Sequence, residues 1–126
     1  MPYRNQKDYL PSVFENLYLG ITLEEFKKIK DTTIMDVDES EYVSYLTEFL
    51  DKKDFKYLVY QFDKHKILYE MIIEFQPGYD IDTFIKNVYG QPNNNEEWLI
   101  DGKDGFQFKI WKFINSLCIA NASYFV

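Results

Sequence analysis

Alternating apolar and polar residues mark two pairs of strands in this 126-residue chain. The first pair covers residues 55–75 (FKYLVYQFDKHKILYEMIIEF), with a polar turn at residues 63–66. The second covers residues 106–125 (FQFKIWKFINSLCIANASYF), with a turn at residues 114–116 between strands 106–113 and 117–125. A period of two places successive side chains on opposite faces of a sheet. The pattern therefore predicts two β-hairpins.

The two strands of the first hairpin differ in the polarity of the side chains on their two faces. The outgoing strand is apolar on both faces at Leu58, Val59 and Tyr60, which predicts a central position in the sheet. In the return strand, alternation predicts one apolar face, made of Ile67, Tyr69, Met71, Ile73 and Phe75. It predicts a second, mixed and partly wet face, made of Leu68, Glu70, Ile72 and Glu74.

Two segments carry both a helical period and helix-end signals. Thr22 with Glu25 forms a capping-box pattern, and Ile21 with Phe26 can form a hydrophobic staple, which predicts a helix over residues 22–30. Residues 81–89 follow Asp80 as N-cap and present apolar side chains at three- and four-residue spacing. Gly90 and Pro92 then predict the end of that helix.

The stretch between the first helix and the first hairpin is less regular. Residues 32–37 are predicted to form a short edge strand or an extended loop, and residues 98–100 a short strand. A third helix is predicted over residues 40–52, where apolar residues recur at three and four positions. The acidic residues there predict a solvated loop, because the glycine and spaced ligands of a calcium loop are absent (Asp36, Asp38, Glu39 and Glu41).

Both halves of the chain therefore have a helix, a polar connection and a hairpin. We expect one α+β domain over residues 1–126, with units at about 20–76 and 80–126. Its antiparallel sheet would have four or more strands from the two helix–hairpin units, with the helices packed on one face.

Short motifs in both halves resemble a known family. Gly20-Ile21-Thr22 opens a predicted helix, and Tyr89-Gly90-Gln91-Pro92 closes another and is followed by Trp98 and an aromatic hairpin. These features resemble the outer-membrane assembly lipoprotein family BamE (SmpA). They are also similar to the tandem helix–hairpin unit of the β-lactamase inhibitor protein. The resemblance implies a bacterial helix–hairpin fold that binds other proteins.

Composition narrows the classes of partner. A net charge of −7, from 14 basic and 21 acidic residues, disfavours nucleic acid and is explained either by simple solubility or by a partner that carries a basic patch. The chain has no apolar run long enough to span a membrane. Without a signal segment, we expect a cytoplasmic protein if the given start is native, and a cell-envelope protein if a leader was removed. The oligomeric state stays open.

The residues that usually carry catalysis or metal binding have structural explanations here. His65 is the single histidine and lies in a predicted turn, and Cys118 lies in an apolar strand. Neither setting suits a general base, a thiolate or a zinc ligand. No nucleophile elbow or glycine-rich phosphate loop is present. We therefore expect no enzymatic activity, no cofactor and no metal.

Aromatic residues are the one feature that suggests a site. They make up 19% of the chain, and several fall on predicted strands beside Glu70 and Glu74. These carboxylates are expected on one face, as a solvent-facing stripe paired with Lys56 or another strand lysine, or as part of a binding surface. The candidate binding residues are Tyr57, Tyr60, Tyr69, Glu70, Glu74, Trp111 and Tyr124.

Three functions remain open at this point. The first is a non-enzymatic domain that binds a protein through an aromatic and acidic sheet face. The second is an immunity-type inhibitor of a basic toxin or nuclease, because acidic surfaces steer onto basic sites. The third is a small-ligand-binding protein with an aromatic pocket between sheet and helices.

Overall fold

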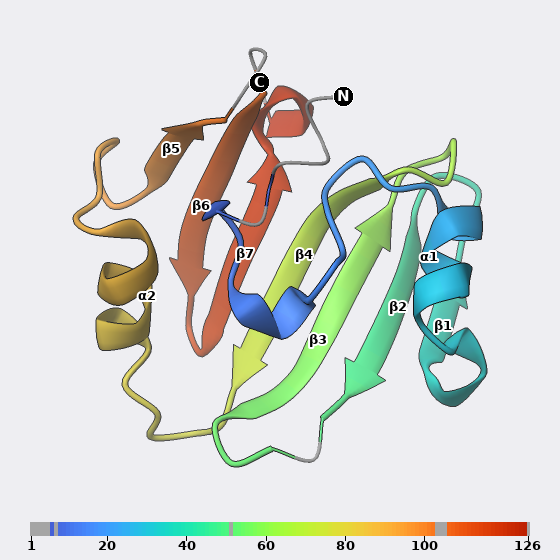
Figure 1. The fold of residues 1–126 in the computed structure, drawn as a ribbon, viewed down its shortest axis with the longest axis horizontal. Coiled ribbons are helices and arrows are strands. Elements are labelled where there is room, and N and C mark those ends of the chain that lie inside the picture. Colours follow the sequence, from blue (N-terminus) through green and yellow to red (C-terminus); the bar gives the residue numbers. More distant parts are fainter. Residues whose placement is uncertain (1–5, 7, 51, 103–105, 126) are drawn as a thin grey trace.

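The computed structural model describes residues 6, 8–50, 52–102 and 106–125, and within them the chain forms an α+β fold. Seven strands make one antiparallel sheet in the order β1-β2-β3-β4-β7-β6-β5 (Figure 1). The strands are β1 (Asp36–Glu39), β2 (Ser44–Phe49), β3 (Phe55–Phe62), β4 (Leu68–Phe75), β5 (Trp98–Asp101), β6 (Gln107–Phe113) and β7 (Ser116–Asn121). The helices are α1 (Leu23–Ile29) and α2 (Ile81–Tyr89), and the short 3-10 turns are η2 (Ser12–Phe14), η3 (Thr32–Ile34) and η5 (Ala122–Phe125).

The hydrophobic core lies between one face of the sheet and the two helices. Phe26 of α1 packs edge-on against Tyr60 and Phe62 of β3, with ring centroids 4.8 and 5.3 Å apart. Phe84 of α2 packs against Phe75 of β4 at 5.1 Å. We call the sheet face under the helices the core face, and both helices lie over it, as the sequence predicted.

A segment before α1 completes the cover of the core face. Residues 8–22 cross in front of the central strands in Figure 1 and bury Phe14, Leu17 and Leu19. The Gln6 side chain binds both backbone polar groups of Leu19, each at 2.9 Å, which satisfies this buried extended backbone. The core face is therefore closed by polypeptide along its centre.

Both helices have the ends that the sequence predicts. The Thr22 hydroxyl accepts a hydrogen bond from the Glu25 N–H at 3.1 Å, and α1 begins at the next residue. Asp80 accepts one from the Thr83 N–H at 3.1 Å at the start of α2. Gly90 ends α2 with φ of 76°, and its carbonyl accepts a hydrogen bond from the Trp98 indole at 3.1 Å.

The predicted helix over residues 40–52 is wrong, because this segment contains strand β2. Ser44 and Leu46 are buried on the core face, and Tyr45, Thr47 and Phe49 project from the other face. The apolar spacing that fits a helix also fits a strand that is buried on one side. Pairing with β1 and β3 decides for the strand, since packing in the sheet overrides weak local preference.

The predicted faces of β4 are wrong at its start. Gln61 pairs with Glu70, but Phe62 pairs with Leu68, so Tyr69 is an extra residue in a β-bulge. The bulge places Leu68 in the core and leaves Tyr69 beside Gln61 on the opposite face. Tyr69 and Glu70, which alternation would separate, therefore lie on the same side of the sheet.

The last predicted strand is too long. β7 ends at Asn121, and residues 122–125 form the 3-10 turn η5. The Asn121 side chain accepts hydrogen bonds from the Ser123 N–H and hydroxyl, at 3.1 and 2.8 Å, and this local turn stops the strand. Tyr124 consequently lies on a turn and not on a strand.

Edge strand β1 is confirmed as the extended segment near residues 32–37, although it starts at Asp36 and follows the short turn η3. All four of its residues are exposed, so the acidic side chains of Asp36, Asp38 and Glu39 face solvent from a sheet edge. Charges on an edge strand oppose pairing with another chain.

Candidate functional site

The sheet face opposite the helices is the candidate site, and we call it the open face. Direct cross-strand partners share a face, so the register defines its residues. One row across the sheet contains Phe49, Tyr57, Glu74, Ser116 and Phe113. The next row contains Thr47, Val59, Ile72, Cys118 and Trp111. A third contains Tyr45, Gln61, Glu70, Ala120 and Lys109.

The row from β2 to β6 exposes two phenylalanines. Phe49 is 60% exposed and Phe113 is 64% exposed. Between them, Tyr57 and Glu74 are half-buried, and the Tyr57 ring contacts Phe49 edge-on at 6.0 Å. Four strand spacings separate β2 from β6, which places the two phenylalanines about 19 Å apart. The rings of Phe49, Tyr57 and Phe113, which we call the apolar row, therefore extend across the centre of the open face, with Glu74 and Ser116 between Tyr57 and Phe113.

Six of the seven candidate residues from the sequence gather on this side of the sheet, and one does not. Tyr60 is fully buried on the core face, where its hydroxyl donates to the Glu48 carboxylate at 2.7 Å. It therefore lies in the core. The open face carries the others, with Tyr124 contributed by η5 (Tyr57, Tyr69, Glu70, Glu74, Trp111 and Tyr124).

The turn η5 covers one end of the open face. The Tyr124 ring stacks on Tyr69 with centroids 4.9 Å apart, and Phe125 packs edge-on against Trp111 at 5.2 Å. The Tyr124 hydroxyl also donates to the Asp63 carboxylate at 2.6 Å. These contacts tie the segment after β7 to the turn of the first hairpin and to β6.

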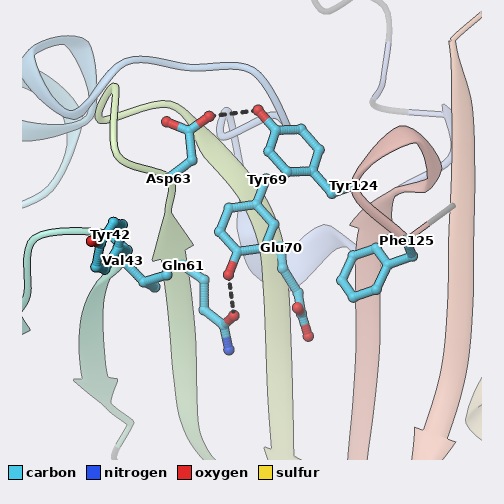
Figure 2. A pocket seen from close by; sticks show the side chains of 8 residues that line it. All are labelled: Tyr42, Val43, Gln61, Asp63, Tyr69, Glu70, Tyr124 and Phe125. Carbon is cyan, nitrogen blue, oxygen red and sulfur yellow. Dashed lines mark hydrogen bonds between the residues drawn. The ribbon is translucent and has the colours of Figure 1, made fainter.

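A pocket of about 430 Å³ lies under this turn. Tyr69 forms part of its wall and donates from its hydroxyl to the Gln61 side-chain oxygen at 3.0 Å. Figure 2 shows its eight lining residues, none of which is basic: Tyr42, Val43, Gln61, Asp63, Tyr69, Glu70, Tyr124 and Phe125. The pocket therefore combines aromatic walls with two carboxyl groups.

Glu70 is the unusual residue of the pocket. Its side chain extends from β4 between those of Gln61 and Phe125 in Figure 2, and the residue is only 6% exposed. Among the described residues, no hydrogen bond or ion pair to its carboxyl group occurs. Burial raises the pKa of Glu70 to about 7. The expected solvent-facing carboxylate paired with a lysine is therefore wrong for Glu70.

The groups around Glu70 keep their protons at neutral pH. Burial, followed by the charges of Glu70, Tyr45 and Asp63, raises the pKa of Tyr69 to about 12. Burial, followed by the charges of Glu70 and Glu74, also raises the pKa of the Cys118 thiol to about 12. Cys118 is thus a buried, protonated thiol, as its place in an apolar strand predicted.

Asp63, the second carboxyl group of the pocket, behaves in the opposite way. Burial alone would raise the pKa of Asp63, but hydrogen bonds lower it below its usual value. The donors are the Tyr124 hydroxyl and the backbone N–H groups of Ile67 and His65. Asp63 is therefore ionised at neutral pH while Glu70 titrates there.

Glu74, four positions after Glu70 on β4, has a hydrogen-bond partner that Glu70 lacks. Its carboxylate accepts a hydrogen bond from the Ser116 hydroxyl of β7. Burial, and then the charge of Glu74, raises the pKa of the neighbouring Tyr57. The two glutamates do lie on one face, as predicted, but in different settings: one is bonded beside the apolar row and the other is buried in the pocket.

The pocket residues that sequence reasoning missed come from loops and the bulge. Asp63 belongs to the turn of the first hairpin, and Tyr42 and Val43 lie in a segment that was predicted to be helical. Their approach to Tyr124 depends on where the chain turns after β7. The one local signal was Asn121-Ala122-Ser123, because an asparagine two residues before a serine favours a turn.

Comparison with known proteins gives no relative: no family model, curated protein or solved structure matches this chain. The resemblance to the BamE family stays a prediction. Across the described ranges, no group of three or more metal-ligating side chains is positioned to hold a metal ion. No helix in those ranges is long and apolar enough to cross a membrane.

Proposed function

We propose that this protein is a non-enzymatic domain that captures another protein through the open face of its sheet. The observation that carries the proposal is the apolar row, with Phe49 and Phe113 exposed on either side of Tyr57. Aromatic side chains that share one open sheet face are enriched at protein interfaces.

The composition of the open face supports an interface. Tyr57 lies half-buried between the exposed phenylalanines and Trp111 lies half-buried in the next row, and aromatic anchors of this kind carry much of the energy in protein interfaces. Their rings are held in place by Phe49 and Phe125, respectively. Preformed contact residues lose little conformational entropy when a partner binds.

Charge favours a basic partner and supports the second candidate, an immunity-type inhibitor of a basic toxin or nuclease. The chain has a net charge of −7, and the open face adds the half-buried Glu74 to the exposed acidic strand β1. An inhibitor that is steered by charge should bind several-fold more slowly when salt rises from low to physiological ionic strength. If binding depends mainly on the apolar row, the association rate should change little with ionic strength.

The two halves of the chain fit a pair of related helix–hairpin units. In each half a helix is followed by an antiparallel meander, α1 by β1 to β4 and α2 by β5 to β7. The last strands of the two meanders, β4 and β7, pair in the middle of the sheet. We propose that the open face is built by this duplication, with one half of the apolar row from each unit.

A double substitution tests the proposed binding surface. Phe49→Ser with Phe113→Ser removes the two most exposed rings of the apolar row and leaves the core face intact. We expect a loss of partner affinity of about tenfold or more, because each ring is placed as an interface anchor. The measurement is quantitative capture of co-purifying proteins by the immobilised wild-type and variant domains.

The matched control is Val88→Ser, which removes a 40% exposed apolar side chain from α2 on the other side of the sheet. This variant should retain the same partners as the wild type. If the double variant also retains them, or if both variants lose them equally, the open face is not the binding surface.

A further inference from the structure

The pocket beneath η5 has the size of a small-ligand site. Its volume of about 430 Å³ falls in the usual range for such sites. The bulge in β4 makes the pocket possible, since it turns both Tyr69 and Glu70 to the open face. A regular strand would have placed Tyr69 in the core.

The buried carboxyl group of Glu70 points to the charge of the ligand. A carboxylate that loses most of its hydration without gaining a protein partner carries a desolvation cost. Glu70 is 6% exposed and has no ion pair among the described residues. A cation that entered the pocket would supply the missing partner, and hydrogen bonds from charged donors are the strong ones.

The aromatic walls of the pocket also favour a ligand with a positive charge. Tyr69 and Tyr124 stack at 4.9 Å, and Phe125 lies 6.5 Å from the Tyr69 ring. The faces of such rings attract organic cations, and a cage of aromatic rings beside a carboxylate recognises ammonium groups. Asp63, which is ionised, adds a second negative charge to the lining of the pocket.

We propose that this pocket binds an organic ammonium or guanidinium cation, with Glu70 as the counter-ion and the rings of Tyr69, Tyr124 and Phe125 as its aromatic wall. The site stands apart from the proposed function when the cation is a free amine. When the cation is a lysine or arginine side chain of a partner protein, the proposed cation site rests on the proposed function and identifies one contact of the interface.

The other charged groups near Glu70 do not replace this ligand. The Lys109 ammonium of β6 forms an ion pair with the Glu97 carboxylate at 3.8 Å and lies 5.6 Å from the centroid of the Phe125 ring. Cys118 of β7 and Tyr69 stay protonated near neutrality, Tyr45 of β2 presents a phenol group, and Glu74 is bonded to Ser116. The balance of fixed charge around Glu70 is therefore negative.

Ligand titration of the ¹⁵N-labelled protein by NMR tests the site. The probes are n-butylammonium, tetramethylammonium and guanidinium, and the matched neutral control is 1-butanol. We expect the cations to shift the amide signals of Tyr69, Glu70 and Tyr124, whereas 1-butanol at equal concentration does not. Ionisation of Glu70 should make binding about tenfold tighter at pH 8 than at pH 5.5.

The variant Glu70→Gln separates a binding role from a structural one. It keeps the shape of the side chain and removes the charge, so it should fold, lose about tenfold in affinity for the cations and lose the pH dependence of binding. Equal affinity of the variant and the wild type would overturn the proposal. The absence of cation-specific shifts at the pocket in the wild type would also overturn it.

Two further arms distinguish the source of the cation. One uses a blocked lysine or arginine dipeptide as probe, and the other uses the free amines. Tighter binding of the blocked dipeptides indicates a partner side chain, and tighter binding of the free amines indicates a small metabolite. Loss of protein capture by the Phe49 and Phe113 variant, with cation binding retained, would show that the two sites are separate.

Discussion

Replacement of Glu70 by glutamine is expected to stabilise the folded protein at pH 8 by about 3 kcal/mol and to change its stability little at pH 4.5. The reason is the buried carboxyl group, which has a pKa of about 7 in the folded chain against 4.5 for an ordinary glutamate. Between these values the folded state holds a proton that the unfolded state has released. The contribution of Glu70 to stability is therefore largest at low pH and falls as the pH rises through 7.

Urea unfolding of both proteins at pH 4.5, 6 and 8 measures this effect, because the difference between wild type and variant cancels the other titrating groups. The control is Glu96→Gln, in an exposed loop, which should change the free energy of unfolding by less than about 0.5 kcal/mol at each pH. A variant that is less stable than the wild type at pH 8 would contradict the account of Glu70.

Truncation of Phe26 to alanine is expected to have the largest effect on stability, a loss of about 3–5 kcal/mol. Phe26 is fully buried and joins α1 to β3 through edge-on contacts with Tyr60 and Phe62. Without the ring, a cavity opens between the helix and the core face. The melting temperature should then fall by roughly 10–20 °C.

The matched control is Ile29→Ala on the same helix, where the side chain is 43% exposed. It should cost less than about 1 kcal/mol, because little apolar area is returned to water. Thermal unfolding followed by circular dichroism measures both variants. Similar losses for the two substitutions would mean that α1 does not dock through Phe26.

Sequence reasoning predicts correctly the elements whose determining residues are close together in the chain. Helix α2 has a cap at Asp80, an unbroken apolar period and a glycine end, and no other segment is needed to explain it. The first hairpin is equally local, with Asp63 forming the turn through bonds to the N–H groups of His65 and Ile67. The prediction that both helices lie on one face came instead from the helix–hairpin pattern of the two halves, and both helices do lie over the core face.

The predictions are wrong where pairing with distant segments determines the local structure. Strand β2 resembles a helix until β1 and β3 pair with it. The bulge at Tyr69 depends on the register between β3 and β4, which alternation alone does not reveal.

The same distinction holds for the site. Tyr57, Glu74 and Trp111 were all among the predicted binding residues, and the strand register brings them to one face. The pocket depends on the bulge and on η5, so Asp63, Gln61 and Phe125 could not be assigned to it from the sequence. Burial of Glu70 is a property of that assembled pocket, which is why its carboxyl group was expected in solvent.

The central claim, that the open face captures a protein, is tested most directly by site-specific photo-crosslinking. A photoreactive amino acid is placed at Phe113 on the open face and, in a separate variant, at Val88 on α2, both exposed positions. We expect the probe at Phe113 to link one partner protein in cells and the probe at Val88 to link none. Linkage of the partner from Val88 alone, or from neither position, would contradict the claim.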